Sequence, residues 1–197
     1  MRTRRPKQVL VAALAGTLMA LASPAIADAQ SSHSSDSDLK PVALQDVKSA
    51  SADGKSVAAA AYYGIRNVKS QKYIQPLGGS SANGTKVVQQ PFNADSLTQL
   101  WTRITDGGYY SFENYSGRNL GIDGASTANG AAAIIANGSG DANQDWVQVD
   151  RDAYTFELHN RKSGKCLGID GASTANGATA AQFTCDGSAN QGWGYFQ

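Results

Sequence analysis

Few side chains in this sequence are of types that could perform catalysis. The two histidines are His33, in a Ser-rich stretch, and His159, in a strand-like stretch where a structural role is favoured. The sequence has no His-Glu-x-x-His, Gly-x-Ser-x-Gly or phosphate-loop pattern. The spacing of the carboxylates leaves acid–base catalysis by Asp and Glu open. Because no other feature points to an enzyme, we predict a non-catalytic protein that needs no cofactor.

An internal repeat organises the second half of the chain. The stretch LGIDGASTANGA spans residues 120–131 and occurs again, letter for letter, at residues 167–178. A more diverged copy, IQPLGGSSANGT, spans residues 74–85. A Gln-x-Trp triplet follows each copy, and the tryptophans are Trp101, Trp146 and Trp193. A period of about 45 residues indicates a repeated architecture.

The repeats are expected to be built of β-strands. Short apolar or alternating runs such as YSFEN, YTFELHN and KVVQQ are separated by Gly, Asn and Ser clusters. No stretch shows the spacing of an amphipathic helix. One unit of about four short strands cannot bury its own apolar face, so three units are expected to close around a shared axis.

The N-terminal region divides into two segments. Residues 1–27 combine a basic start, a short apolar run and small residues, which is the pattern of a secretory signal peptide that is cleaved after Ala27 or Ala29. Residues 28–57 are rich in Ser, Ala and Asp and lack aromatic residues, so we predict a flexible tether. One domain over residues 58–197 is then expected.

The charge of the exported chain argues against nucleic acid as a partner. Removal of the signal peptide takes away four of the 17 basic residues and leaves 13 against 16 acidic residues. A chain with a small negative charge lacks the basic footprint that phosphate backbones require. The apolar run of the signal is too short to span a membrane, so no membrane partner is expected after cleavage.

Taken together, these motifs resemble the ricin B-type lectin family of secreted, bacterial-type carbohydrate-binding proteins. The resemblance covers about residues 60–197 and rests on three Gln-x-Trp triplets in register. It implies a β-trefoil of twelve strands with pseudo-threefold symmetry, in which Trp101, Trp146 and Trp193 share the core. It also implies that Gln99, Gln144 and Gln191 fix each repeat's last loop by hydrogen bonds.

Within this frame the two cysteines are expected to be bonded to each other. Cys166 and Cys185 enclose the hairpin of the third repeat, and export favours a disulfide. The equivalent positions are Tyr73 and Phe92 in the first repeat, an aromatic pair that could replace the bridge by packing. In the second repeat they are Asn119 and Gly138, which bridge nothing. Cys-His spacings of the zinc type are absent, so no metal site is predicted.

The resemblance also implies a shallow sugar pocket on each repeat, made by an Asp after Cys-Leu, an aromatic residue on the next strand and an Asn before Gln-x-Trp. This sequence departs from that pattern, because the Asp positions hold Gly168, Gly121 and Gln75. The candidate ligand-binding residues of the third repeat are Asp170, Phe183, Asn190 and Gln191. Those of the second repeat are Asp123, Asn143 and Gln144, and the first repeat, with Gln90 and Thr98, is expected to be silent.

Two interpretations of the displaced carboxylates remain open. Alternation along a strand would keep Asp170 on the same face as Gly168, where it could replace the missing acceptor. Alternatively, Asp170 and Asp123 only begin Asp-Gly turns.

The function predicted from these features is weak, multivalent binding of glycans that contain galactose or xylose, by a secreted protein expected to be a monomer. The alternative is a trefoil with degenerate sugar pockets that acts through protein contacts, as an inhibitor or adaptor.

Overall fold

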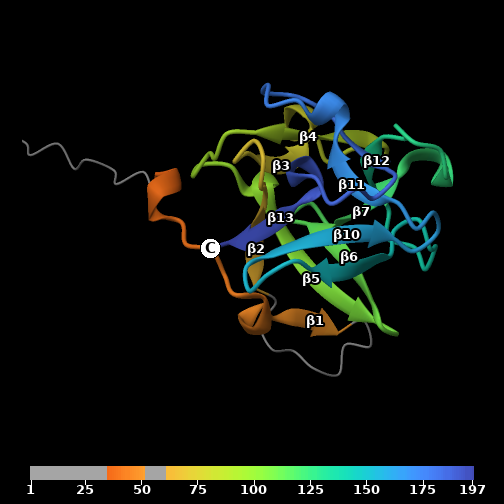
Figure 1. The fold of residues 1–197 in the computed structure, drawn as a ribbon, viewed down its shortest axis with the longest axis horizontal. Helices are drawn as coiled ribbons and strands as arrows, with labels where there is room; N and C mark the ends of the chain where they lie inside the picture. Colours follow the sequence, from red (N-terminus) through yellow and green to blue (C-terminus); the bar gives the residue numbers. More distant parts are fainter. Residues whose placement is uncertain (1–34, 52–60) are drawn as a thin grey trace, which may run out of the picture. The chain divides into compact units, whose positions relative to one another are not determined.

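The structure is a computed structural model that describes residues 35–51 and 61–197. The predicted signal peptide over residues 1–27 lies outside the described residues. The described part consists of β-strands and short 3-10 turns (Figure 1), and it contains no helix that could cross a membrane. The strands are β1 (Ser49–Ser51), β2 (Tyr62–Asn67), β3 (Tyr73–Pro76), β4 (Thr85–Gln90), β5 (Leu100–Asp106), β6 (Tyr109–Asn114), β7 (Arg118–Ile122), β8 (Ala133–Ala136), β9 (Trp146–Asp150), β10 (Thr155–Asn160), β11 (Cys166–Ile169), β12 (Ala180–Phe183) and β13 (Trp193–Phe196).

Strands β2 to β13 form a β-trefoil, as the sequence predicts. Six strands close into a barrel through antiparallel pairs in the order β2, β5, β6, β9, β10, β13 and back to β2. The other six form three hairpins, β3–β4, β7–β8 and β11–β12. The hairpins also contact one another, through β4–β8 pairing and two isolated bridges. The repeats are therefore β2–β5 (repeat 1), β6–β9 (repeat 2) and β10–β13 (repeat 3).

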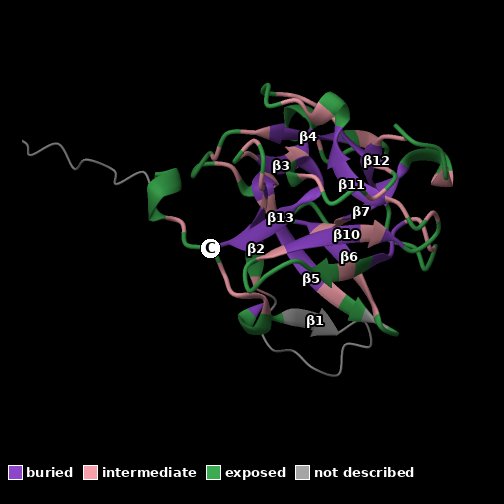
Figure 2. Cartoon of the chain, in the orientation of Figure 1, coloured by how far each residue is buried: buried purple, intermediate pink, exposed green. Residues whose placement is uncertain are grey.

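The three tryptophans lie in one common core. Trp101, Trp146 and Trp193 are at most 1% exposed and belong to a single apolar cluster. Figure 2 shows that the central strands of the cartoon are mostly buried. Each indole Nε1–H donates a hydrogen bond of 3.0 Å to a backbone carbonyl of its own repeat, and the acceptors are Ile74, Leu120 and Leu167. A buried indole N–H needs such a partner, so the bond fixes the hairpin to the core.

A buried asparagine at the end of the first strand of each repeat joins that repeat to its neighbour. Asn67 donates to the backbone oxygens of Asn190 and Gly192 in repeat 3, at 2.9 and 3.3 Å. Equivalent bonds run from Asn114 of repeat 2 to repeat 1 and from Asn160 of repeat 3 to repeat 2. Several of these carbonyls, those of Gly192, Leu100 and Asn143, also accept a backbone N–H, so the carboxamides add a second hydrogen bond at the seams of the trefoil.

The two identical loops rest on identical side chains of the next repeat. Gln182 donates to the carbonyls of Ser126 and Ala128, at 2.8 and 3.0 Å. Gln89 donates in the same way to the loop of repeat 3. The diverged loop of repeat 1 instead lies on Ile135, which occupies the equivalent position and offers only its backbone carbonyl. The sequence identity of the two loops therefore coincides with identical binding partners.

Residues 35–51, which we name the N-terminal strap, differ from the flexible tether expected over residues 28–57. The strap pairs with the barrel through β1, which lies parallel to β5, and through backbone bonds from Val42 to Tyr195 and between Lys40 and Gln197. Val47 is buried in the core cluster. The composition argument failed here because backbone pairing and one buried side chain hold the strap, without aromatic residues. Residues 28–34 and 52–57 lie outside the described residues.

The predicted disulfide is present in repeat 3. Cys166 and Cys185 are bonded, and their Cα atoms lie 5.0 Å apart. In repeat 1 the rings of Tyr73 and Phe92 pack at 5.6 Å between centroids, which confirms the predicted aromatic replacement.

We expect Val47→Ala to lower the free energy of unfolding by about 2 kcal/mol, because it removes buried methyl groups and leaves a cavity. Urea denaturation followed by tryptophan fluorescence measures the change. Val147→Ala is the matched control, since Val147 is 38% exposed and its truncation should cost less than about 0.5 kcal/mol. Equal effects of the two variants would show that the strap is not docked in solution.

Removal of the disulfide by Cys166→Ala with Cys185→Ala is expected to cost about 3 kcal/mol, since the bond closes a loop with a sequence separation of 19 residues. Denaturation with and without a reductant checks this. The wild type should respond to the reductant, and the double variant should not. An unchanged midpoint in the double variant would contradict the prediction.

Candidate functional site

A hollow of about 350 Å³ opens on the surface of repeat 3. We call it the repeat-3 hollow, and its lining residues are Asn129, Ile169, Gly171, Ala172, Phe183, Thr184, Asp186, Asn190 and Gln191. It is bounded by the turn after β11, by the end of β12 and by the residues before β13. Repeat 2 contributes as well, because Asn129 in its duplicated loop hydrogen-bonds to the hydroxyl of Thr184 at 3.3 Å.

The structure brings three of the four candidates of repeat 3 into this hollow. Phe183 ends β12 and is half-buried, so part of its ring faces solvent. Asn190 is 9% exposed; it accepts a bond from the Ser188 hydroxyl and donates to the carbonyl of Ile169, at 2.5 and 3.4 Å. These bonds hold its carboxamide in a fixed orientation beside the ring.

Gln191 lines the hollow but uses its carboxamide for structure. It donates to the carbonyl of Thr184 and accepts from the backbone N–H of Asp186, at 2.9 and 3.1 Å. The equivalent bonds of Gln99 and Gln144 hold the corresponding loops of repeats 1 and 2. All three glutamines therefore fix their loops, as the resemblance implies.

Asp170 does not line the hollow. It is exposed and begins the 3-10 turn η6 (Asp170–Ala172), in which Gly171 and Ala172 have φ of +58° and +47°. The extended strand ends at Ile169, so the alternation that would have kept Asp170 facing the hollow is broken. Asp123 begins the equivalent turn η5 (Asp123–Ala125) and is exposed in the same way.

Asp186 supplies the carboxylate of the hollow, and sequence reasoning missed it. Its carboxylate accepts the backbone N–H of Ser188 at 2.9 Å. Hydrogen bonding from the side chain and the backbone N–H of Ser188 lowers the pKa of Asp186, because it stabilises the charged form. The only sequence signal is its place directly after Cys185, in the loop that Gln191 holds.

Glycine at the usual Asp position packs closely against the glutamine of the same repeat. A Cβ atom at Gly168 would lie 3.1 Å from Cγ of Gln191 and 3.2 Å from Nδ2 of Asn190. At Gly121 a Cβ atom would lie 2.9 Å from Cγ of Gln144. A larger side chain at either position would require the glutamine to shift, whereas in repeat 1 Gln75 is accommodated and accepts a hydrogen bond from Gln99 at 3.0 Å.

The corresponding surfaces of the other two repeats differ from that of repeat 3. Repeat 1, expected to be silent, has a hollow of about 410 Å³, which we call the repeat-1 hollow; it is lined by Gln75, Gly78, Gln90, Pro91, Phe92 and Asn93. In repeat 2 the carboxamide of Asn143 donates to the carbonyl of Ile122 at 3.1 Å, and Ala136 stands at the position of the ring. Repeat 2 therefore lacks the aromatic surface that Phe183 gives repeat 3.

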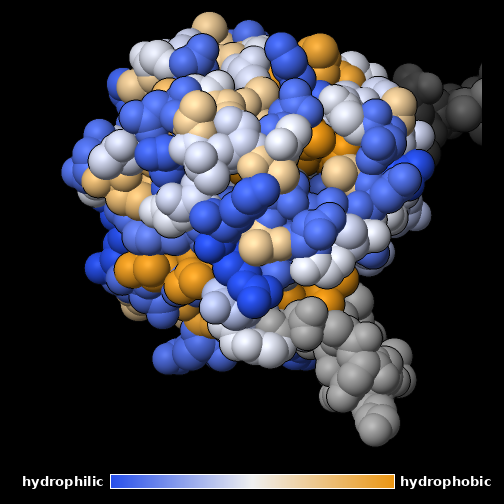
Figure 3. Space-filling model, turned by 90° about the vertical axis from the view of Figure 1, so that its right-hand side faces the viewer, coloured by the Kyte–Doolittle hydropathy of each residue, from blue (hydrophilic) through white to orange (hydrophobic). Residues whose placement is uncertain are grey.

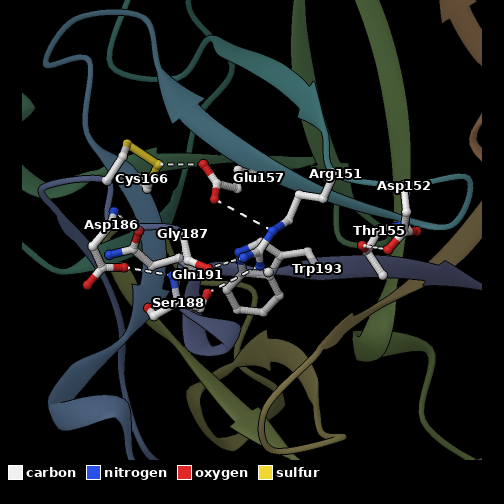
Figure 4. A network of polar contacts seen from close by, with 12 residues as sticks. Arg151, Asp152, Thr155, Glu157, Cys166, Asp186, Gly187, Ser188, Gln191 and Trp193 are labelled. Atoms are coloured by element: carbon white, nitrogen blue, oxygen red, sulfur yellow. Dashed lines mark hydrogen bonds and ion pairs between the residues drawn. A yellow bond between two sulfur atoms is a disulfide. The ribbon is translucent and has the colours of Figure 1, made fainter.

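Among the described residues one group has the composition of a metal site. Glu157, His159, Cys166 and Cys185 each place a ligand atom within 4.8 Å of the others. Their sulfur atoms form the disulfide, and His159 Nε2 lies 2.9 Å from the Glu157 carboxylate. Figure 4 shows Arg151 on the other side of Glu157, bound to the backbone of the loop before β13. With no thiolate available, this group is a structural network of repeat 3.

Comparisons with known proteins agree with this architecture. The ricin-type β-trefoil lectin domain matches residues 61–193 as a family model. The designed threefold-symmetric protein ThreeFoil is 33% identical, with a TM-score of 0.66 over 69% of this chain and 98% of ThreeFoil. An exo-β-1,3-galactanase from Clostridium thermocellum, 1,3Gal43A, is 30% identical, with a TM-score of 0.68 over 71% of this chain and 31% of that enzyme. No curated protein sequence matched the chain.

A ricin B-like lectin from Macrolepiota procera, solved with lactose, is 21% identical and shares the fold, with a TM-score of 0.60 over 72% of this chain and 98% of the lectin. The chain thus spans nearly all of ThreeFoil and of this lectin, but only about a third of the galactanase. The family match runs from the start of the trefoil to Trp193, the first residue of its last strand. On this basis the chain belongs to the ricin-type β-trefoil lectin family.

Proposed function

We propose that this protein is a secreted, non-catalytic lectin whose leading binding site is the repeat-3 hollow. Family membership supports carbohydrate binding in general. The single observation that carries the site is the half-buried ring of Phe183, flanked by the carboxylate of Asp186 and the carboxamides of Asn129 and Asn190.

The chemistry of this hollow suits a sugar ring. One face of a pyranose carries C–H groups that pack on an aromatic ring, while its hydroxyls need hydrogen-bond partners. Asp186 accepts two such bonds, and the two asparagines can donate and accept. Asp186 takes the part that the resemblance gives to an Asp after Cys-Leu, although it comes from the loop after Cys185.

Affinity at one such site is expected to be weak, because the hollow is shallow and solvent-exposed. The repeat-1 hollow offers Phe92 and Asn93 on a second repeat of the same domain. A polymer that engages both sites gains from the effective concentration of the second contact. The face seen in Figure 3 is mostly hydrophilic, with small separate apolar patches, and this suits a hydrated polysaccharide.

Galactose- and xylose-containing polysaccharides are the first ligands to test. The galactanase similar to this chain acts on a β-1,3-galactan by its name, which makes that polymer a direct choice. Affinity electrophoresis with galactan, arabinogalactan and xylan measures retardation of the protein. Retardation that free galactose or xylose reverses supports the proposal, and silence on all three polymers together with a broad glycan array overturns it.

The alternative function, binding to a protein through degenerate pockets, has one supporting observation. Tyr62, Leu97 and Tyr115 are 37%, 48% and 50% exposed, and the two tyrosine rings lie 5.5 Å apart. A partner captured from culture supernatant and insensitive to free sugars, combined with a silent glycan array, would favour this alternative.

We expect Phe183→Ala to weaken binding of the preferred polysaccharide about ten-fold, because the sugar loses its stacking surface. Isothermal titration with oligosaccharide measures the dissociation constant. Tyr154→Ala is the control, since Tyr154 is 49% exposed and lies outside the repeat-3 hollow. If both variants bind like the wild type, Phe183 does not form the site.

Binding should be insensitive to pH from neutrality down to the ordinary Asp value of 3.8 and should fall only below it, because the pKa of Asp186 is lowered and its charged form accepts the sugar hydroxyls. The Asp186→Asn variant should bind the polysaccharide more weakly, and its binding should not fall further below pH 3.8. Titrations between pH 3 and 7, with circular dichroism to exclude unfolding, test the prediction. A decline centred well above 3.8 would contradict it.

A further inference from the structure

Three equivalent positions on the rim of the barrel are filled in different ways. In repeat 1 the ring of Tyr73 packs against Phe92 and Phe196, at 5.6 and 6.0 Å between centroids. Gly64 makes room for this ring, because a Cβ atom there would lie 2.8 Å from it. In repeat 3 the same space holds the disulfide together with Glu157.

Repeat 2 has neither the aromatic rings of repeat 1 nor the disulfide of repeat 3 at these positions, and a hollow lies there. The register places Asn119, Ser111 and Ile104 where repeat 1 has Tyr73, Gly64 and Phe196. The result is a cavity of about 420 Å³, which we call the repeat-2 cavity; it is lined by Ile104, Ser111, Glu113, Asn119, Gly138, Ser139 and Gly140. It shares no lining residue with the repeat-3 hollow.

Asn119 is a buried polar side chain without a partner in the described structure. Its exposed fraction is 8%, and its carboxamide makes no hydrogen bond to any described residue. A Cβ atom at Gly138 would lie 3.4 Å from its Nδ2, so the carboxamide faces the loop that borders the cavity. No fully buried side-chain nitrogen or oxygen of the described residues lacks a hydrogen-bond partner, so the carboxamide of Asn119 reaches solvent in the cavity, where it is available to a bound ligand.

The other polar groups of the cavity favour a positively charged ligand. Glu113 is half-buried and forms no ion pair with any residue that the structure describes. The hydroxyl of Ser111 has one long bond, of 3.4 Å, to the buried Asp145. No Lys, Arg or His lines the cavity. Ile104 adds an apolar wall.

We propose that the repeat-2 cavity binds an amino sugar, with its ammonium group paired to Glu113 and its hydroxyls bonded to Asn119 and Ser111. The C–H face of the ring packs on Ile104, and the volume accommodates one ring. The charge-assisted bond to Glu113 selects an amine over a neutral sugar. This site is separate from the one proposed for neutral glycans, so either can exist without the other.

The test is a titration of the ¹⁵N-labelled protein with glucosamine at mildly acidic pH, followed by two-dimensional NMR. Glucose, which lacks the amine, and N-acetylglucosamine, in which the amine is neutral, are the matched ligands. Glucosamine should shift the backbone amides of Glu113, Asn119 and Gly138–Gly140 saturably. The two matched ligands should bind there at least about ten-fold more weakly.

Two kinds of variant locate the effect. Glu113→Gln should weaken glucosamine binding about ten-fold, and Asn119→Cys with Gly138→Cys, which copies the bridge of repeat 3, should abolish it by filling the cavity. Phe183→Ala should leave it unchanged. Glu113→Gln keeps the test valid if the cysteine variant does not fold.

Several results would overturn the proposal. One is the absence of saturable shifts at these amides, and another is equal binding of all three ligands that Glu113→Gln does not alter. Shifts confined to Phe183, Asn190 and their neighbours would also overturn it, and would instead support the neutral-glycan site of repeat 3. Conversely, loss of polysaccharide binding in Phe183→Ala leaves this proposal unaffected.

Discussion

The trefoil depends on buried carboxamide side chains that hydrogen-bond from one repeat to the backbone of the neighbouring repeat. At each seam between repeats the chain leaves one strand and turns, and the carboxamides donate to backbone carbonyls there, several of which also accept a backbone N–H. Asn67, Asn114 and Asn160 supply N–H donors at these points and remain about 1% exposed. Buried polar groups that lack partners cost more than a bond contributes, so these positions tolerate little change.

The same requirement shapes the surface hollows. Where Gln144 and Gln191 reach the loops they hold, the neighbouring strand positions are Gly121 and Gly168, and a Cβ atom there would contact the glutamine closely. The carboxylate that the family pattern puts there is absent from all three repeats. In repeat 3 an acid from the loop after the disulfide, Asp186, stands in the hollow instead. Gln191 therefore both packs against Gly168 and holds the loop that carries Asp186.

Much of the fold follows from the sequence because its signals repeat. Three Gln-x-Trp triplets in register fix the number of units, the position of the core and the closure of the barrel. The pairs Cys166–Cys185 and Tyr73–Phe92 follow from the same alignment. The direction of the Asp170 side chain does not follow from the sequence. It depends on whether the strand ends at Ile169 or continues through Asp170, and the Asp-Gly pair is compatible with both. Asp186 lies in a loop where no periodicity applies.

The strap shows a different limit of sequence reasoning. Composition measures the apolar side chains that a segment can bury, whereas this segment is held chiefly by its backbone. Only the exposed backbone groups of the barrel, and the space around Val47, reveal that it is placed there. The cavity of repeat 2 is similarly invisible in one sequence, since it appears only when the three equivalent positions are superposed.

The identical loops have a consequence for how the chain finds its native pairing. Residues 120–131 and 167–178 carry the same letters and meet the same kind of glutamine, so locally neither can be told from the other. A misassembled ring in which they exchange places, within one molecule or between two, would keep those contacts. The correct order is distinguished by the side chains that lie at the equivalent positions beside the loops. The disulfide of repeat 3, the aromatic rings of repeat 1 and the unfilled positions of repeat 2 distinguish the three units.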